Sequence, residues 1–563
     1  EDPREPTTQL SCMNLEDYNW AKTTGLRANL LWEASEKATF KAQFWWQDRN
    51  TGGDSRYHPF DAYNPNPTDP VYAGNHDSNV QPFTFFQEGK FRSGDYAQTP
   101  KPDEQRIYSL TGNFELPFAD LTAIASRYER DFQYKFDSTW IIMFLLRNNF
   151  GNDPCINPGE PGADPPGCLR SDLLFGLTDQ TQSLVQDAFE FRFNSKKSDS
   201  PFQWVAGGFY RKRESTFHSY VPVINAEGLT FSDSSPPTLP PGSEIGAGVP
   251  GCDPCVFARE DNKDIEETAV FGEINWSITD AIDLNVGARY FKVKQAEAGR
   301  TVFQFAAFAP NPPDSTTPDG ATPFVIGHLS DNELPWKVAL AWHTSENVTL
   351  YALRANGFRL GGTNNRGVAN IFIPEEFSSD ELVNYEVGAK SLLANGRVTL
   401  NASAFLMEWD NLQVSGQDST GAFGFIGNAG KAEVQGFELE FATAVSDSFD
   451  VSAQLTYLTK HELTEDQVTD TFNASGKKGD QLPRVPEMTG SFIAQYNYDL
   501  PVGGWNGAFR FEGYYTDKSF TELSPDNPNN RFQDSYAIFN ARANFHNNGM
   551  DLDITLFVEN IFD

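Results

Sequence analysis

Apolar and polar residues alternate with a period of two along much of this 563-residue chain, and no other feature constrains the fold as strongly. In residues 397–406, one face carries Val398, Leu400, Ala402, Ala404 and Leu406, and the other carries Arg397, Thr399, Asn401 and Ser403. The same alternation recurs in 270–278, 283–290, 491–498 and 551–559. Strict alternation indicates a half-buried β-strand. These stretches match the roughly 9–11 tilted residues with which a strand crosses a bilayer.

Other classes of protein fit the composition poorly. No apolar run reaches the roughly 18–20 residues of a transmembrane helix, and the longest candidate, 140–146, ends at Arg147. Disorder is disfavoured because aromatic residues make up 14% of the chain, whereas disordered chains are poor in them. A net charge of −34 opposes binding to nucleic acid, which requires neutralisation of phosphates by cations. An aromatic-rich all-β chain remains.

Connections between the alternating segments are short and long in turn. The short ones lie near 35–37, 118–120, 196–201, 279–281, 345–347, 395–396, 446–448, 501–506 and 547–550. The long ones are 49–104, 133–180, 217–262, 297–332, 359–379, 414–428, 463–484 and 519–533. Outer-membrane barrels combine short periplasmic turns, long extracellular loops and aromatic girdles. Tryptophans near the strand ends suit such girdles, namely Trp32, Trp45, Trp46, Trp204, Trp336, Trp342 and Trp409. We therefore predict an all-β fold, an antiparallel transmembrane β-barrel with short periplasmic turns and long extracellular loops.

Eighteen strands are predicted over residues 1–563. They start near 24, 37, 105, 120, 181, 202, 263, 282, 333, 348, 380, 397, 429, 449, 485, 507, 534 and 551. The first strand runs toward a short turn and the last runs away from one, so both ends lie on the long-loop side. A complete bacterial barrel has both ends in the periplasm, so an odd number of strands is expected to be missing at each end.

Six stretches of the chain resemble the barrel of TonB-dependent outer-membrane receptors. The first three are Glu381-Leu-Val-Asn-Tyr-Glu-Val-Gly-Ala-Lys390, Asn395-Gly-Arg-Val-Thr-Leu-Asn-Ala-Ser-Ala-Phe405 and Asn428-Ala-Gly-Lys-Ala-Glu-Val-Gln-Gly-Phe-Glu-Leu-Glu440. The others are 351–364, 482–486 and Val558-Glu-Asn-Ile-Phe-Asp563. Individual residues in these stretches have clear structural roles. Tyr385 and Glu386 lie on opposite faces of a strand, Asn395-Gly396 suits a tight hairpin, and Gly436 relieves crowding where a strand bends.

The resemblance implies a twenty-two-stranded barrel, of which this chain would supply strands 4 to 21. The family's plug domain, its TonB-contacting segment and the last strand would then lie outside this sequence. It also implies that extracellular loops capture a scarce solute, and that the inner-membrane TonB complex drives import by displacing the plug. An iron chelate, a cofactor or an oligosaccharide would each suit as solute.

No catalytic or metal-binding motif is found, and no cofactor is expected. The seven histidines are scattered, without the paired spacing of metal ligands. Cys155 and Cys168 fall in one long loop, and Cys252 and Cys255 in another. Because the cell surface is oxidising, two loop disulfides are the favoured interpretation. Half a metal site or a redox motif remain as alternatives for the Cys-x-x-Cys pair.

Two long loops supply the candidate ligand-binding residues. Loop 49–104 contributes Arg56, Tyr57, His58 and Tyr63, and loop 359–379 contributes Arg359, Asn364, Asn365 and Arg366. Aromatic faces combined with amide and guanidinium donors suit a sugar or a chelate ring. The alternative for each residue is a loop packed on itself with solvated polar tips.

Three functions are consistent with these observations. The first is an active-transport receptor in the outer membrane of a Gram-negative bacterium. The second is a passive, porin-like diffusion channel, and the third is a structural or interaction barrel. The expected partners are the TonB complex, outer-membrane lipid and lipopolysaccharide, a small solute and an outer-membrane protein or lipoprotein.

Overall fold

The computed structural model describes residues 20–52, 101–138, 175–196, 200–224, 255–303, 325–364, 373–417, 424–467, 476–500, 503–525, 530, 532–547 and 549–562. Every named element in these ranges is a β-strand. Within these ranges, no helix is long and apolar enough to cross a membrane.

The strands follow the alternating segments of the sequence. They are β1 (Ala21–Ser35), β2 (Ala38–Thr51), β3 (Lys101–Glu115), β4 (Ala119–Asp137), β5 (Phe175–Ser195), β6 (Phe202–Ile224), β7 (Cys255–Thr279), β8 (Ile282–Phe303), β9 (Val325–Glu333), β10 (Trp336–Ser345), β11 (Val348–Arg359), β12 (Gly362–Thr363) and β13 (Glu376–Phe377). They continue with β14 (Asp380–Leu393), β15 (Val398–Asp410), β16 (Gln413–Gln417), β17 (Gly424–Asn428), β18 (Ala432–Ala444), β19 (Phe449–Leu463), β20 (Met488–Asp499), β21 (Trp505–Thr516), β22 (Ser519–Phe520), β23 (Phe532–Gln533), β24 (Tyr536–Asn547) and β25 (Leu552–Val558).

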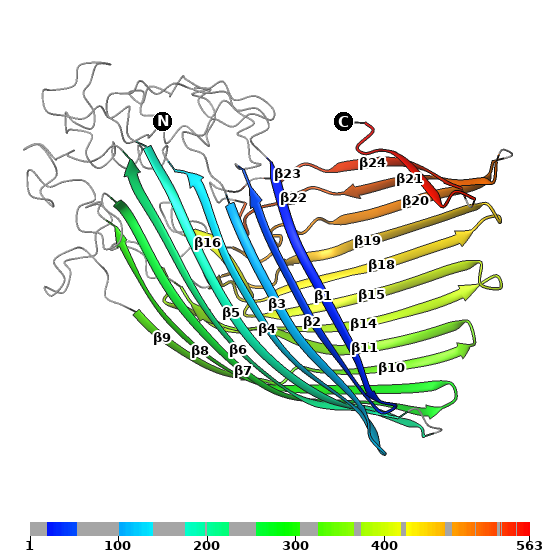
Figure 1. Ribbon diagram of the computed structural model, residues 1–563, viewed down its shortest axis with the longest axis horizontal. Coiled ribbons are helices and arrows are strands. Elements are labelled where there is room, and N and C mark those ends of the chain that lie inside the picture. The colour runs from blue at the N-terminus through cyan, green and yellow to red at the C-terminus, as the bar shows by residue number, and fades with distance from the viewer. Residues whose placement is uncertain are drawn as a thin grey trace, which may run out of the picture.

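One antiparallel sheet contains nineteen of these strands (Figure 1). Both β9 and β10 pair with β8, and Leu334-Pro335 separates them. Proline has no N–H to donate to a ladder, so β9 and β10 form a single interrupted strand. The described sheet therefore has the eighteen predicted strand positions. The predicted loops 359–379, 414–428 and 519–533 each contain part or all of a small two-stranded ladder.

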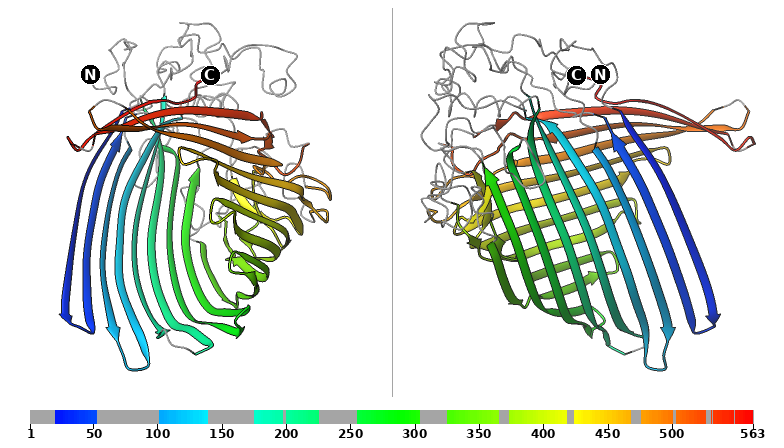
Figure 2. Two further views of the ribbon diagram at one scale, coloured as in Figure 1. Left: turned by 90° about the vertical axis from the view of Figure 1, so that its right-hand side faces the viewer. Right: turned by 60° about the vertical axis from the view of Figure 1, so that its left-hand side comes forward.

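The sheet curves into a barrel wall in which β1–β9 face β10–β25 across the interior (Figures 1 and 2). Among the described strands, β1 pairs with β2 alone and β25 with β24 alone. The first and last strands are therefore the two edges of the described sheet.

Side chains of opposite character line the two faces of the wall. Exposed apolar residues share one face, which we call the outer face; the register joins Leu340, Ala352, Val387, Ala404 and Phe437 into one of its rows. The opposite, inner face carries polar contacts such as the hydrogen bond from the Tyr351 hydroxyl to Glu386 Oε1 at 2.5 Å. Tyr385 lies on the outer face and Glu386 on the inner face, as predicted.

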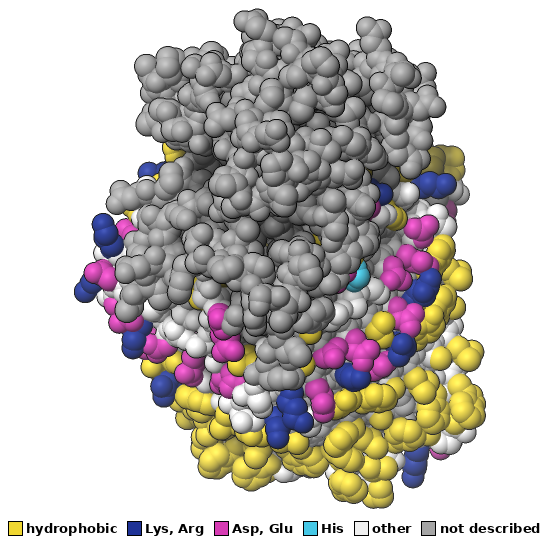
Figure 3. Space-filling model, turned by 90° about the vertical axis from the view of Figure 1, so that its left-hand side faces the viewer, with side chains coloured by type: hydrophobic (Ala, Val, Ile, Leu, Met, Phe, Trp, Pro, Cys, Tyr) yellow, Lys and Arg dark blue, Asp and Glu magenta, His cyan; other side chains and the backbone are white. Residues whose placement is uncertain are grey.

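A belt of ion pairs lies on the outer face above the apolar band (Figure 3). It includes Arg127, which bonds Glu129 at 2.7 Å and Asp187 at 3.0 Å, and Lys212, which bonds Glu214 at 2.5 Å. Below it, large apolar side chains such as Phe189 and Val270 are exposed. The step from apolar to charged residues along one face is the profile of a strand leaving the hydrocarbon layer.

The structure also departs from the sequence-based expectations. Strands β5 to β8 are 21 to 25 residues long and extend into the predicted loops 133–180, 217–262 and 297–332. Trp45 and Trp409 lie on the inner face rather than in an outer girdle, because alternation along each strand puts them on the face opposite to Trp46 and Ala404. Trp409 contacts the guanidinium of Arg359 there. Trp32, Trp46, Trp336 and Trp342 are on the outer face, as expected.

The two predicted roles for glycine are confirmed. The turn after β14 has positive φ angles of 58° at Asn395 and 86° at Gly396. Gly436 lies at a register shift between β18 and β19. A Cβ placed on it would come within 2.5 Å of the Tyr457 carbonyl oxygen.

Candidate ligand-binding rim at the long-loop end

Polar side chains gather where β11, β14 and β15 reach the long-loop end of the wall. We call this group the rim cluster, and it consists of Arg359, Asn364, Asp380, Asn411, Gln413 and Asn428. The β-ladder itself brings Arg359 and Asp380 together, because they are register partners at the end of the β11–β14 pair.

A buried carboxylate is at the centre of the rim cluster. The Asp380 side chain is 1% exposed. It accepts hydrogen bonds from Arg359 Nε at 2.9 Å, from the Arg359 backbone N–H at 3.1 Å and from the Gln413 backbone N–H at 3.0 Å. Arg359 Nη2 also donates to Asp380, and it donates to the Gln413 carbonyl oxygen at 2.9 Å. The guanidinium lies 4.8 Å from the centre of the Trp409 ring, which adds a cation–π contact.

Two amide side chains tie the neighbouring loops to this pair. Gln413 Nε2 donates to the carbonyl oxygens of Leu360 and Ser378, both at 3.0 Å. Asn428 Nδ2 donates to the Asn411 carbonyl oxygen at 2.8 Å. The hairpin β16–β17 is therefore fixed to the ends of β11 and β14 by backbone-directed hydrogen bonds.

Asn364 performs the same task from the other side. Its Nδ2 donates to the carbonyl oxygens of Ile426 at 2.7 Å and Pro374 at 2.9 Å, and its Oδ1 accepts from the Ile426 N–H at 2.8 Å. These bonds use both donor hydrogens of the amide. In this structure Asn364 therefore joins β12 to β17.

A small hydrophobic cluster supports the rim from within. Its buried members are Leu412, Val414, Ala429, Ala432, Leu463 and Leu482, and Leu523 packs against them. Next to Leu523, burial raises the pKa of the Glu522 carboxyl, and the positive charge of Arg484 opposes that shift. The cluster anchors the loop-side segments on the strands beneath them.

The inner face below the rim is polar and charged. Arg211 Nη2 lies 2.6 Å from Glu267 Oε2, and Arg289 lies over the rings of Phe209, Phe271 and Phe291. The buried Nε atoms of Arg211, Arg213 and Arg289 have no hydrogen-bond partner among the described residues. No described Lys or Arg nitrogen lies within 4.0 Å of the Glu386 or Glu438 carboxylate. Such a surface suits contact with a polar body inside the barrel.

The structure describes two of the eight predicted ligand residues, Arg359 and Asn364, and places both in the rim cluster. Arg56, Tyr57, His58, Tyr63, Asn365 and Arg366 lie outside the described residues. The site residues Asp380, Asn411, Gln413 and Asn428 were not predicted from the sequence. Asp380 precedes the recognised Glu381–Lys390 stretch directly, which is the one signal that pointed to it.

The cysteine prediction falls largely outside the described part of the chain. Cys155, Cys168 and Cys252 are not described, and Cys255 is described only as the first backbone residue of β7. Among the described side chains, no group of three or more His, Cys, Asp or Glu residues is arranged to hold a metal ion.

Comparison with known proteins also indicates a β-barrel. Residues 16–561 match the family model for the TonB-dependent receptor-like β-barrel. The probable TonB-dependent siderophore receptor PiuA of Acinetobacter baumannii is 26% identical over 314 residues, which cover 53% of this chain and 37% of that protein. The metal-pseudopaline receptor CntO of Pseudomonas aeruginosa is 26% identical over 163 residues, covering 29% of this chain and 20% of that protein. These two sequence matches thus cover well under half the length of the curated relatives.

Solved structures share the fold at low sequence identity. The ferric yersiniabactin uptake receptor FyuA of Yersinia pestis superposes with a TM-score of 0.65 at 14% identity, covering 96% of this chain and 66% of that one. The siderophore receptor PiuA of Acinetobacter baumannii also gives 0.65, at 17% identity, with 97% and 71% covered. With a family match along nearly its whole length and a fold to accompany it, this chain belongs to the TonB-dependent receptor-like β-barrel family.

Proposed function

We propose that the chain forms the barrel of an active-transport receptor that binds an iron chelate outside the cell and imports it with energy from the TonB complex. Family membership places the barrel in the outer membrane of a Gram-negative bacterium. The observation that carries the proposal is the family match over residues 16–561. The choice of an iron chelate is supported by the names of relatives such as the siderophore receptor PiuA.

The inner face supports a receptor over an open channel. Glu386 and Glu438 face the interior without a described cation, and the buried Nε atoms of Arg211, Arg213 and Arg289 have no hydrogen-bond partner within the described ranges. A polar plug domain supplied by the full-length protein would pair with these groups. An open porin has no such domain to supply a cation to these carboxylates or an acceptor to the arginine Nε atoms.

The rim cluster gives the outer end of the barrel a fixed shape. We assign Arg359 and Asn364 to positioning, because Nε and Nη2 of Arg359 and the side-chain amide of Asn364 are used in bonds to Asp380 and to backbone atoms. Direct contact with the chelate is then assigned to Arg56, Tyr57, His58, Tyr63, Asn365 and Arg366. The two groups act together, since a fixed rim reduces the loss of entropy when the loops bind a ligand.

Uptake of radiolabelled iron chelates by cells tests the function. Cells that express the full-length receptor are compared with a deletion strain and with cells that lack TonB. The proposal predicts saturable uptake that is lost in both controls. Uptake that persists without TonB would support a diffusion channel, and binding without uptake would support an interaction barrel.

Substitutions test the assignment of residues. Arg366→Ala should raise the KM for uptake, because it removes a proposed ligand contact. Arg397→Ala is the matched control, since this half-exposed arginine lies at the short-turn end of β15. Equal KM values for the two variants would overturn the placement of the ligand site at the rim.

A further inference from the structure

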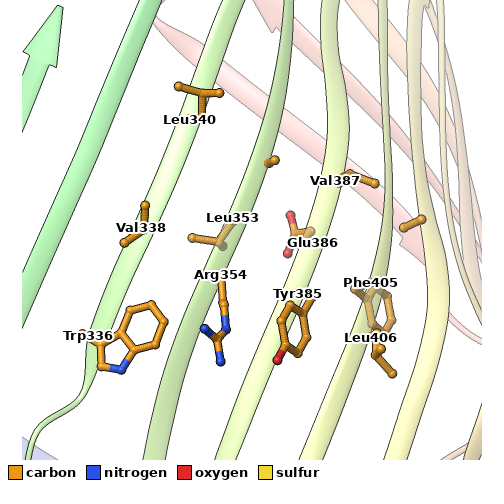
Figure 4. Close-up of a pocket in the computed structure, with 12 residues that line it drawn as sticks. Trp336, Val338, Leu340, Leu353, Arg354, Tyr385, Glu386, Val387, Phe405 and Leu406 are labelled. Carbon is orange, nitrogen blue, oxygen red and sulfur yellow. The ribbon is translucent and has the colours of Figure 1, made fainter.

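An arginine on the outer face lies between two aromatic rings at the upper edge of the apolar band. Arg354 of β11 is opposite Val338 of β10 and Tyr385 of β14 in the register. Its guanidinium carbon is 4.9 Å from the centre of the Trp336 ring and 5.2 Å from that of Tyr385. Figure 4 shows the three side chains in a row, with Arg354 between the rings.

The height of Arg354 on the wall follows from its neighbours. Outer-face residues toward the short turns are apolar, such as Leu340 and Val387. On the long-loop side, Asn356 Nδ2 donates to Glu381 at 2.7 Å, which begins a polar row. Arg354 therefore lies at the boundary between hydrocarbon and headgroups, where a charge on the lipid face costs far less than at the midplane.

No ion pair or hydrogen bond of the Arg354 guanidinium is found among the described residues. This sets it apart from Arg127, also on the outer face, which pairs with Glu129 and Asp187. The two rings flank the guanidinium, and no described acceptor occupies its N–H groups. The N–H edge is the part that binds a carboxylate or phosphate with two parallel hydrogen bonds.

An apolar groove adjoins the guanidinium on the side of the membrane interior. This open groove has a volume of about 810 Å³, and the outer-face residues that line it include Trp336, Val338, Leu340, Ala352, Val387 and Leu406. This volume is within the range of roughly 300–1,000 Å³ that small-molecule sites occupy. A cation at the headgroup level above an apolar groove matches a molecule with an anionic head and a hydrocarbon tail.

We propose that Arg354, Trp336 and Tyr385 form a binding site for a phosphorylated glycolipid of the outer leaflet. The phosphate binds the N–H edge of Arg354, and an acyl chain lies in the groove between Val338 and Val387. The occupant is a lipid rather than free phosphate, because the groove continues the site into the hydrocarbon layer. The site does not depend on the import function, since it lies on the outside of the barrel.

Binding of lipid A to the full-length receptor tests this site. The purified receptor is titrated with diphosphoryl lipid A and with its dephosphorylated form, and native mass spectrometry counts the bound lipids. Arg354→Gln should weaken binding of the diphosphoryl form about ten-fold, the loss expected for a charge-assisted hydrogen bond. Arg127→Gln is the matched control and should bind like the wild type.

The outcomes separate the sources of phosphate. The proposal holds if Arg354→Gln lowers affinity for the diphosphoryl form alone, and if millimolar inorganic phosphate does not compete. Equal affinities in both variants, or competition by inorganic phosphate, would overturn it. Because Arg354 is exposed to lipid, the variant should fold; a heat-modifiable band on electrophoresis confirms the barrel, and unchanged chelate uptake shows that the import function is intact.

Discussion

The pair of Arg359 and Asp380 allows a quantitative test of the rim cluster. A double-mutant cycle with Arg359→Gln and Asp380→Asn removes one charge, then the other, then both. Asparagine keeps the shape of aspartate, and glutamine keeps a neutral N–H donor on a shorter side chain than arginine. The cycle therefore reports the coupling between the two charged side chains.

The size of the coupling follows from burial. A hydrogen bond to a charged group contributes about 1.5–3 kcal/mol. Asp380 is buried, whereas the Arg359 side chain is 47% exposed, so solvent screens part of the attraction. We expect a coupling of about 1–2 kcal/mol, which corresponds to about a 5- to 30-fold change in an equilibrium constant.

Hydrogen exchange measures the coupling where it acts. The Gln413 amide donates to Asp380, so its exchange rate in the intact receptor reports local opening of the rim. Asp410→Asn is the control, because Asp410 pairs with Lys431 at 2.8 Å but both side chains are more than half exposed. The reasoning is refuted if the cycle gives less than about 0.5 kcal/mol of coupling, or if the control accelerates exchange as strongly as Asp380→Asn.

Three further predictions concern single residues. Gly436→Ala should lower the free energy of unfolding by about 1–3 kcal/mol, because the new methyl group meets the Tyr457 carbonyl oxygen. Gly357→Ala is the control, because a methyl group there enters open space. The urea midpoints of the two refolded variants measure the difference in stability. Gly396→Ala should cost about 1 kcal/mol, because φ there is 86°; thermal unfolding measures it, and an unchanged midpoint would contradict the strain argument. Glu522→Gln should slow hydrogen exchange in 519–525 relative to the wild type at neutral pH and have no effect well below pH 4.5, because burial raises the pKa of Glu522, so its deprotonated form destabilises the fold and its protonated form does not; the same ratio of variant to wild-type exchange rates at both pH values would contradict this.

The strand order of this barrel was predictable because each strand pairs with its sequence neighbour. Period-two alternation located all eighteen positions, and the alternation of short and long connections set their directions. The alternation also assigned faces correctly for Tyr385 and Glu386. In a meander of hairpins, local sequence determines topology, so little long-range information is needed.

Strand ends were harder to predict, for a physical reason. Above the apolar band the outer face of the wall is charged, as at Arg127 and Asp187. Both faces are then polar, and the alternation that reveals a strand disappears. The upper parts of β7 and β8 thus resemble loop sequence although the ladder continues.

The rim cluster depends on register and could not be predicted. Arg359 was selected from its sequence, but Asp380 and Gln413 contact it only because the β11–β14 ladder ends at that pair and the β16–β17 hairpin folds beside it. Residue types alone identify Arg359 as a hydrogen-bond donor. Its acceptors are 21 and 54 residues away in the sequence, so only the folded structure identifies them. The same holds for Arg354, whose flanking rings come from two different strands.

The unequal strand lengths tilt the mouth of the barrel. Strand β7 has 25 residues and β11 has 12, and a strand rises about 3.3 Å per residue. At a strand tilt of roughly 40°, the wall at β7 therefore stands on the order of 30 Å taller than the wall at β11. The tall side would hold the surface sugars of the cell away from the mouth of the barrel. A diffusing solute has its shortest route over the low side, where Arg359 and Asp380 lie. Antibodies and phages that approach the cell from outside would instead reach the tall side first and the low side second.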